Sequence, residues 1–253
     1  RCYRSLSSLP QRIMKIDVSD TWPTDTEGAI AVQNCLRNQV ITTDQFDTIT
    51  TVAGVDAGFE QNGTVTRAAV VVLRLPELTL LEQAIAYRPT TFPYVPSLLS
   101  FREMPTVLDA LKQLAIEPDL ILCDGAGIAH PRRLGIASHL GVLIDKPTIG
   151  IAKSRLLGTH AELSDQKGVW VPLMDRGERI GAVLRSRTGT KPLFVSAGHR
   201  ISLETAVSYV LQCTPKYRLP ETTRLADRLA SNRGPMPALG TATKSTTEQM
   251  NLF

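Results

Sequence analysis

The sequence predicts an α/β fold in which helices flank a mixed β-sheet. The 253 residues are 43% hydrophobic and 21% charged, a composition that can bury a sizeable core within one domain. Strand-like runs follow one another early in the chain, and later ones alternate with stretches of helical periodicity. Strands joined by turns pair antiparallel and strands joined by helices pair parallel, so the combination predicts a sheet of mixed direction.

One helix and three strands are predicted first. Residues 24–36 have apolar residues at helical spacing, and Thr24 with Glu27 three residues later matches a capping box. Three runs with strand composition follow, at residues 51–57, 67–73 and 78–87.

Helices and strands then alternate. Residues 103–114 place apolar side chains on one helical stripe, and they lead into residues 119–123, a largely apolar run suited to a buried parallel strand. The later predicted elements are helices over residues 134–144 and 203–211, and strands at residues 148–152, 180–185 and 193–196.

The two ends of the chain differ from the middle. Residues 1–13 are polar and basic without apolar periodicity, and Met14 begins a stretch more typical of a natural start. We expect residues 1–13 to be a non-native or disordered extension and residues 14–230 to form a single domain. Residues 231–253 are rich in Gly, Pro, Ser and Thr, which predicts a disordered tail.

Composition narrows the class of protein. The four cysteines form no Cys-x-x-Cys pair, so neither a zinc cluster nor a disulfide framework is indicated. No apolar run reaches the roughly 18 residues that a membrane span needs, and the first residues lack the apolar centre of a secretory signal. We expect a cytoplasmic protein that does not enter a membrane and, without any assembly signal, a monomer. The net charge of +4 permits contact with a polyanion but does not require it.

Acidic residues at strand ends carry the chemistry. Asp56 and Asp124 each close an apolar strand, and Gly125 lets the backbone after Asp124 approach a ligand. Each of these, like Glu103 at a predicted helix start, is by itself more typical of a turn or cap. Brought together they would repel unless a cation lay between them, and their oxygen ligands suit Mg²⁺ or Mn²⁺.

Five separated motifs are spread over roughly residues 17–212: VAGVDAG, PYVPSLLSFRE, LILCDGAGIAHPRRLGIASHLG, PTIGIAKSRLLG and VSAGHRISLETAV. Together and in this order they resemble the motifs of the endonuclease V family. The resemblance implies a ribonuclease H-like domain, with which the predicted order of elements is compatible. It also implies DNA repair by hydrolysis of the second phosphodiester 3′ to deoxyinosine, which leaves 3′-hydroxyl and 5′-phosphate ends.

The resemblance also implies a catalytic set. Asp56 and Asp124 would be the main metal ligands, and Glu103 would complete the site directly or through water. His199 would take the late-chain catalytic position, and Lys153 would contact a phosphate or neutralise the carboxylates. The implied metal is Mg²⁺, for which Mn²⁺ can substitute.

A rigid aromatic loop is the second functional element. Tyr94 lies between Pro93 and Pro96, so its ring loses little entropy on binding and can enter a base stack. By itself such a loop is more often plain packing, and the resemblance is what makes Tyr94 a wedge.

Further residues are implied around the flipped base. The resemblance gives a base pocket of Leu99, Gly125 and Ile136. His130 and Arg132 would orient the active-site loop or touch phosphate, and for His130 a structural hydrogen bond is an equal expectation.

Three other functions remain open from the sequence. An endoribonuclease specific for inosine would use the same site with contacts to the 2′-hydroxyl. A catalytically inactive lesion-binding module would be expected to lack a carboxylate, and all three are present. A Ser-His-Asp hydrolase is disfavoured because no Gly-x-Ser-x-Gly motif occurs. The expected partner is DNA that contains a deaminated purine, or inosine-containing RNA.

Overall fold

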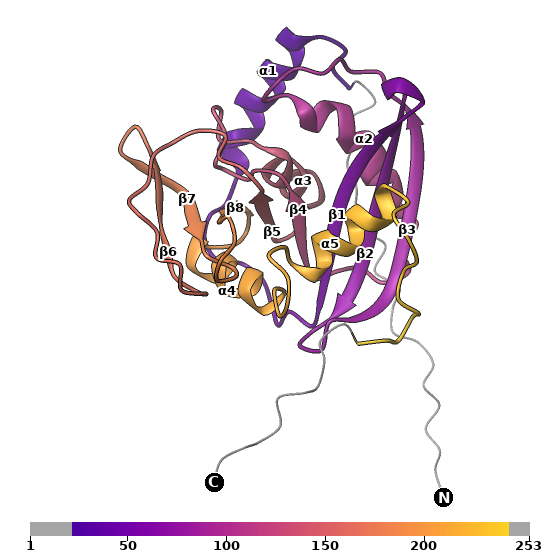
Figure 1. Cartoon of the computed structure of the whole chain (residues 1–253). Helices are drawn as coiled ribbons and strands as arrows, with labels where there is room; N and C mark the ends of the chain where they lie inside the picture. Colours follow the sequence, from indigo (N-terminus) through magenta and orange to yellow (C-terminus); the bar gives the residue numbers. More distant parts are fainter. Residues whose placement is uncertain (1–21, 243–253) are drawn as a thin grey trace, which may run out of the picture.

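A computed structural model describes residues 22–242 of the chain and shows one eight-stranded sheet with helices on both faces (Figure 1). The strand order is β3-β2-β1-β4-β5-β8-β7-β6. The strands are β1 (Thr51–Glu60), β2 (Val65–Arg74), β3 (Thr79–Pro89), β4 (Leu120–Asp124), β5 (Thr148–Ala152), β6 (Trp170–Asp175), β7 (Glu178–Leu184) and β8 (Leu193–His199). The α-helices are α1 (Thr26–Leu36), α2 (Leu99–Lys112), α3 (Ile136–Ile144), α4 (Leu203–Gln212) and α5 (Glu221–Ala230).

The sheet has mixed direction, which confirms the predicted α/β class. β1, β2 and β3 form an antiparallel set, and β4 pairs parallel with β1 and with β5. β8 runs antiparallel to β5, and β7 and β6 continue antiparallel from it. The parallel strands β1, β4 and β5 therefore end at one edge of the sheet, where α/β proteins place ligands.

The alternation of side chains along β1 separates two hydrophobic layers. Val52 packs with residues of α4 and α5, whereas Ala53 and Val55 pack with residues of α2 and α3. Because successive strand side chains point to opposite faces, Gly54 and Asp56 lie on the α5 face with Val52. Figure 1 shows α5 in front of β1 and β2.

The last helix, α5, was not predicted from the sequence. It follows Pro220 and buries Leu225, Ala226 and Leu229, which lie at helical spacing against the sheet. Its closest approach is at Gly54 of β1, where a Cβ atom would lie 2.2 Å from the Thr222 carbonyl. Only a glycine leaves room for the helix backbone at this point.

Helix α2 begins four residues before its predicted start at residue 103. It contains Pro105, which has no N–H for the carbonyl of Phe101 one turn earlier. Trp22 Nε1 donates to that carbonyl at 2.8 Å instead. The hydrogen bond from Trp22 explains how the helix continues through a proline. The earlier start of α2 places Glu103 within the helix rather than at its start.

Other boundaries shift by a few residues. The N-cap of α1 is Asp25, whose side chain accepts from the Gly28 N–H at 2.7 Å, so Thr24 is not the cap. Strand β6 also lacked a prediction. Residues 1–13 and 243–253 lie outside the described range.

Part of the segment predicted as a tail lies along the edge strand β3. The N–H of Gly240 donates to the Leu80 carbonyl at 2.8 Å, and the N–H of Leu80 donates to the Thr241 carbonyl at 3.2 Å. No helix within residues 22–242 is long and apolar enough to cross a membrane.

Candidate active site

Asp56 and Asp124 lie next to each other at the edge where β1 and β4 stop pairing. Val55 pairs with Cys123 in the parallel register, so the following residues, Asp56 and Asp124, occupy the next position on neighbouring strands. Val52 of β1 and Leu122 of β4 belong to the core layer that contains α5, and the alternation of side chains puts both carboxylates on that face. The predicted acidic pair is therefore brought together.

Glu103 adds a third carboxylate from α2. Burial, followed by the negative charges of Asp56 and Asp124, raises the pKa of Glu103 to about 8. Arg102 opposes this rise only in part. Glu103 thus faces the acidic pair although its helix packs on the other side of the sheet.

Lys153 supplies the cation in contact with this cluster. It follows β5, and its Nζ forms an ion pair with Asp124 Oδ2. Burial alone would lower the pKa of Lys153, but the bond to Asp124 and the nearby charge of Asp56 raise it. Lys153 is therefore charged at neutral pH and neutralises part of the acidic site, one of its two expected roles.

Asp227 on α5 is a fourth carboxylate that sequence reasoning missed. Burial raises the pKa of Asp56 to about 7, and the charges of Asp124 and then Asp227 contribute to the rise. Asp227 also raises the pKa of Lys153. The available signal was the stripe formed by Leu225 and Leu229, which predicts a helix that contains Asp227.

The carboxylate cluster fits a hard divalent cation by its chemistry. Four carboxylates from β1, β4, α2 and α5 supply only oxygen donors, and one of them, Asp227, is paired with Arg233 at 2.8 Å. Burial first, and then the neighbouring negative charges, raise the pKa values of Asp56 and Glu103. Within residues 22–242, no three His, Cys, Asp or Glu side chains lie close enough together to hold a metal ion as they stand, and Lys153 contacts Asp124. A bound cation would relieve the repulsion that Lys153 relieves in part.

His199 does not join this cluster. β8 runs antiparallel to β5, and His199 pairs with Thr148, whereas Asp124 pairs with Ile151. Three residues along a strand are about 10 Å, so His199 lies towards the opposite end of the sheet. Its Nδ1 accepts the Ile41 N–H at 3.2 Å, a structural bond that holds the segment before β1.

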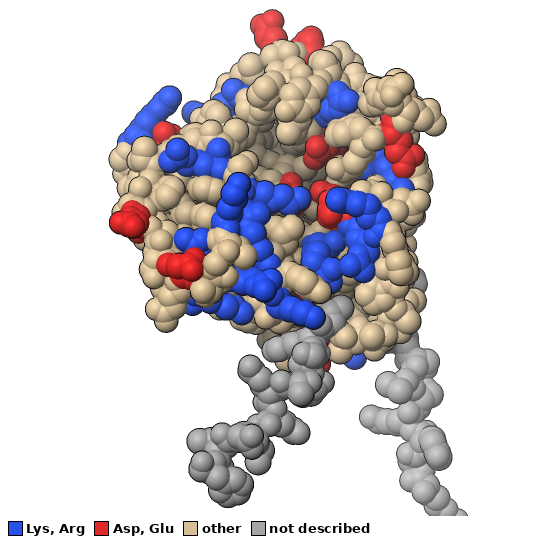
Figure 2. Space-filling view, viewed as in Figure 1, with Lys and Arg blue, Asp and Glu red and all other residues tan. Residues whose placement is uncertain are grey.

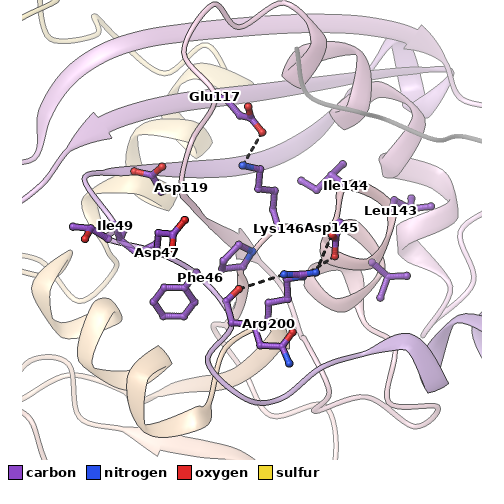
Figure 3. A pocket seen from close by; sticks show the side chains of 14 residues that line it. Phe46, Asp47, Ile49, Glu117, Asp119, Leu143, Ile144, Asp145, Lys146 and Arg200 are labelled. Atoms are coloured by element: carbon purple, nitrogen blue, oxygen red, sulfur yellow. Dashed lines mark hydrogen bonds and ion pairs between the residues drawn. The ribbon is translucent and has the colours of Figure 1, made fainter. Parts of the chain in front are cut away.

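A cavity of about 900 Å³ lies near His199 and apart from the carboxylates (Figure 3). It is lined by residues before β1, at the start of β4 and at the end of α3. Lys146 in its wall pairs with Glu117 at 2.6 Å, and Arg200 pairs with Asp145 at 2.6 Å. Glu117 and Asp145 are thereby paired with cations, and Asp119 in the same wall accepts hydrogen bonds from Thr50 and Thr51, so three of the four carboxylates of this cavity already have partners.

The predicted wedge loop joins β3 to α2. Phe92 and Leu98 are buried at its two ends, whereas Tyr94 is 68% exposed. Pro93 and Pro96 are exposed on either side of it. The loop therefore holds an aromatic ring out in solvent between two anchored ends.

His130 and Arg132 lie beneath this loop and hold it at Ser97. Arg132 Nη2 donates to Ser97 Oγ at 2.7 Å, and Arg132 Nε donates to the side chain of Gln33 in α1. His130 Nε2 lies 2.9 Å from the Ser97 carbonyl, while Nδ1 accepts the Arg132 N–H at 3.2 Å. Burial lowers the pKa of His130 to about 4, so the neutral ring donates from Nε2.

The predicted pocket residues lie beside the cluster. Gly125 follows Asp124 with φ +143°, and a Cβ there would lie 2.6 Å from Ile136 Cγ2. Leu99 is one turn before Glu103 on α2, so the two share a helix face. All three predicted pocket residues are partly exposed, which leaves surface for a ligand.

Comparison with known proteins gives one consistent family. Residues 34–228 match the family model for endonuclease V. An endonuclease V of Trichormus variabilis is 64% identical over 221 residues, which are 87% of this chain and 100% of that protein. An endonuclease V of Rippkaea orientalis is 60% identical over 223 residues, 88% of this chain and 97% of that protein.

Solved structures agree with the sequence matches. The crystal structure of endonuclease V from Streptomyces avermitilis superimposes with a TM-score of 0.81 at 45% identity, and the match covers 85% of this chain and 95% of that one. Endonuclease V from Ciona intestinalis was solved with a 23mer DNA containing an inosine followed by a ribo-adenosine. It superimposes with a TM-score of 0.72 at 30% identity, and the match covers 81% of this chain and 95% of that one. The predicted ribonuclease H-like fold is confirmed.

Proposed function

The chain belongs to the endonuclease V family of nucleases, and we propose that it hydrolyses the second phosphodiester bond 3′ to deoxyinosine in DNA. The products would keep the lesion on the nicked strand and carry 3′-hydroxyl and 5′-phosphate ends. One observation carries this proposal: four carboxylates from separate elements converge around Asp56 and Asp124. The DNA bound by the Ciona relative supports the choice of substrate.

The proposed catalysis depends on a divalent cation, Mg²⁺ or Mn²⁺. Asp56 and Asp124 would hold it, with Glu103 directly or through water and Asp227 as the fourth carboxylate. When bound, the cation would supply charge stabilisation at phosphorus and a more acidic attacking water. We propose Asp227 for the late-chain position expected of His199, because Asp227 faces Asp56 and His199 lies towards the opposite end of the sheet.

The chain's own residues would bind and orient the strand. Lys153 beside Asp124 presents a positive charge where the scissile phosphate would lie. The exposed ring of Tyr94, held by Pro93 and Pro96, would fill the stack vacated by the flipped base. The base would enter the pocket at Leu99, Gly125 and Ile136, while His130 and Arg132 would keep the wedge loop in place.

End-labelled duplexes with a single deoxyinosine test this function. Wild type is compared with Asp124→Ala on the lesion duplex, on an undamaged duplex and on matched inosine RNA, with magnesium or with chelator. Asp47→Ala is the matched control, because Asp47 is an exposed carboxylate in the wall of the other cavity. We expect magnesium-dependent nicking 3′ of deoxyinosine that is lost only in Asp124→Ala.

Three other outcomes of this experiment would each change the proposal. Cleavage of the RNA alone would replace the proposal with an inosine-specific endoribonuclease. Binding of the lesion duplex by folded wild type without any cleavage would indicate a binding module. Equal cleavage by Asp124→Ala would refute the carboxylate site.

A further inference from the structure

Arg218, in the loop between α4 and α5, ties three segments together beside the carboxylates. Its Nη2 donates to the carbonyls of Lys153 and Pro192, both at 2.8 Å, and its Nε donates to the Lys191 carbonyl at 2.7 Å. Ser186 Oγ donates back to the Arg218 carbonyl at 2.7 Å. The segments after β5, before β8 and before α5 thus meet next to the lysine that contacts Asp124.

Most of the cations on these three segments form no ion pair with a carboxylate. Among residues 22–242, none of the ion pairs involves the cations of these segments other than Lys153 and Arg185. Bonds from Arg218 to carbonyls leave its charge in place. We define the basic tract as five of these cations, Arg155, Arg187, Lys191, Lys216 and Arg218, of which all but the half-buried Arg218 are exposed.

Tyr217 lies beside the basic tract and packs against both Lys216 of the tract and Arg224, a cation whose charge is paired. Arg224 lies 4.5 Å from the centre of the Tyr217 ring, and Lys216 lies 5.5 Å from it. Arg224 is held by the buried Glu221, so the ring has a fixed support. Figure 2 shows Lys and Arg side chains gathered beside the acidic side chains in the central hollow of this face.

The basic tract and the wedge loop lie on opposite sides of the carboxylates. The wedge loop starts at the end of the edge strand β3 and is held at Ser97 by residues that follow β4, whereas the tract lies beyond the ends of β5 and β8 that adjoin it. Asp56 on β1 and Asp124 on β4 lie between them in the strand order. A strand that enters from the base pocket and passes the carboxylates therefore continues onto the tract.

We propose that the basic tract binds the sugar-phosphate backbone of the cut strand on the 3′ side of the scissile bond. This inference rests on the proposed function, because the base pocket and the position of the cut give the strand its direction. Exposed Lys and Arg side chains contact phosphates without reading bases, so the tract would add affinity and register.

The test measures binding in chelator, so that cleavage does not interfere. Lys191→Ala/Lys216→Ala is compared with wild type on a labelled deoxyinosine duplex, on the same duplex ending just 3′ of the cut, and on one shortened at the 5′ side. The control Arg74→Ala/Lys112→Ala removes two exposed cations without carboxylate partners, at the end of β2 and the end of α2. Fluorescence anisotropy over a salt series gives the affinity and its salt slope.

We expect the tract variant to bind the full duplex about tenfold more weakly at low salt, with a slope of log affinity against log salt shallower by about two. Shortening the 3′ side should remove this difference from wild type, and shortening the 5′ side should keep it. A wild-type slope for the variant, or a defect that survives 3′ shortening, would overturn the inference. An undamaged duplex of the same length is measured with wild type in the same assay, and equal affinity for it and for the deoxyinosine duplex would instead refute the proposed function.

Discussion

Replacing Gly54 with alanine tests whether the close packing of α5 against β1 at Gly54 positions the fourth carboxylate, Asp227. The new Cβ would lie 2.2 Å from the Thr222 carbonyl, so the helix must retreat by about 1.2 Å to reach the 3.4 Å of ordinary contact. Asp227, one to two turns along α5, moves with it and away from Asp56. A displacement of about 1 Å in a catalytic group can reduce the rate by about a hundredfold.

The same change reduces stability to a smaller degree. Overpacking of this kind costs about 1–3 kcal/mol, and in a domain of this size each kcal/mol lowers Tm by about 2–4 °C. We expect Gly54→Ala to fold with Tm lower by about 2–12 °C while single-turnover cleavage of the deoxyinosine duplex at a lower temperature falls about a hundredfold. Lesion binding should change little, because the wedge and pocket do not contact α5.

Gly58→Ala is the matched control. Gly58 lies on the same face of β1, but its Cβ would be 3.4 Å from the Ala230 carbonyl, and neither glycine has a positive φ. This variant should cleave within about threefold of wild type, since surface-like changes cost about 0.5 kcal/mol or less. Equal cleavage by the two variants, with α5 folded in both, would show that the packing of α5 at Gly54 does not determine the cleavage rate.

Three further changes probe the remaining parts of the site. Asp56→Asn should abolish cleavage yet stabilise the chelator-treated protein by about 1–2 kcal/mol, a discounted value because solvent reaches the site. Burial and neighbouring carboxylates raise the pKa of Asp56 to about 7, so ionising Asp56 costs stability as the pH rises from about 4 to 7. The stability gained by Asp56→Asn should therefore be full above about pH 7 and vanish towards pH 4. A pH series of thermal melts with no gain at pH 8 would contradict this expectation. Tyr94→Ala should weaken lesion binding at least tenfold, the loss of about 1.4 kcal/mol, with Tm unchanged, because the ring is 68% exposed; equal affinity in a binding titration would exclude the wedge. Arg132→Lys loses the forked bonds to Ser97 and Gln33 and should raise KM for the lesion duplex more than it lowers kcat; a loss confined to kcat would place Arg132 in the chemistry instead.

The fold and half of the site follow from local sequence patterns. Asp124 could be placed because the apolar run Leu120–Cys123 has the length and composition of a buried strand, and a carboxylate directly after it lies at the strand end. Asp56 could be placed in the same way, although β1 continues beyond it to pair with β2. Predicting these two residues requires only the composition of a strand and the position where it ends, and a single sequence contains both.

The remainder of the site depends on tertiary geometry. The SAGHR motif shows that His199 ends a strand but not that β8 runs antiparallel to β5, and this direction carries His199 away from Asp124. Asp227 lies on a helix whose position is set by the Gly54 contact, a meeting of segments far apart in the chain. Sequence patterns carry neither the direction of a strand nor the partner of a helix.

The packing of α5 on β1 also determines when the carboxylate cluster is completed during synthesis. β1 is the first strand made and α5 is the last helix of the described chain, and chains leave the ribosome at roughly 5–20 residues per second. A nascent chain that has reached β5 can already pair the strands bearing Asp56 and Asp124, yet it lacks Asp227 and leaves the apolar face around Val52 uncovered. The growing chain therefore passes through a stage in which the strands bearing Asp56 and Asp124 exist without Asp227, and the four-carboxylate cluster is complete only after α5 has packed on β1.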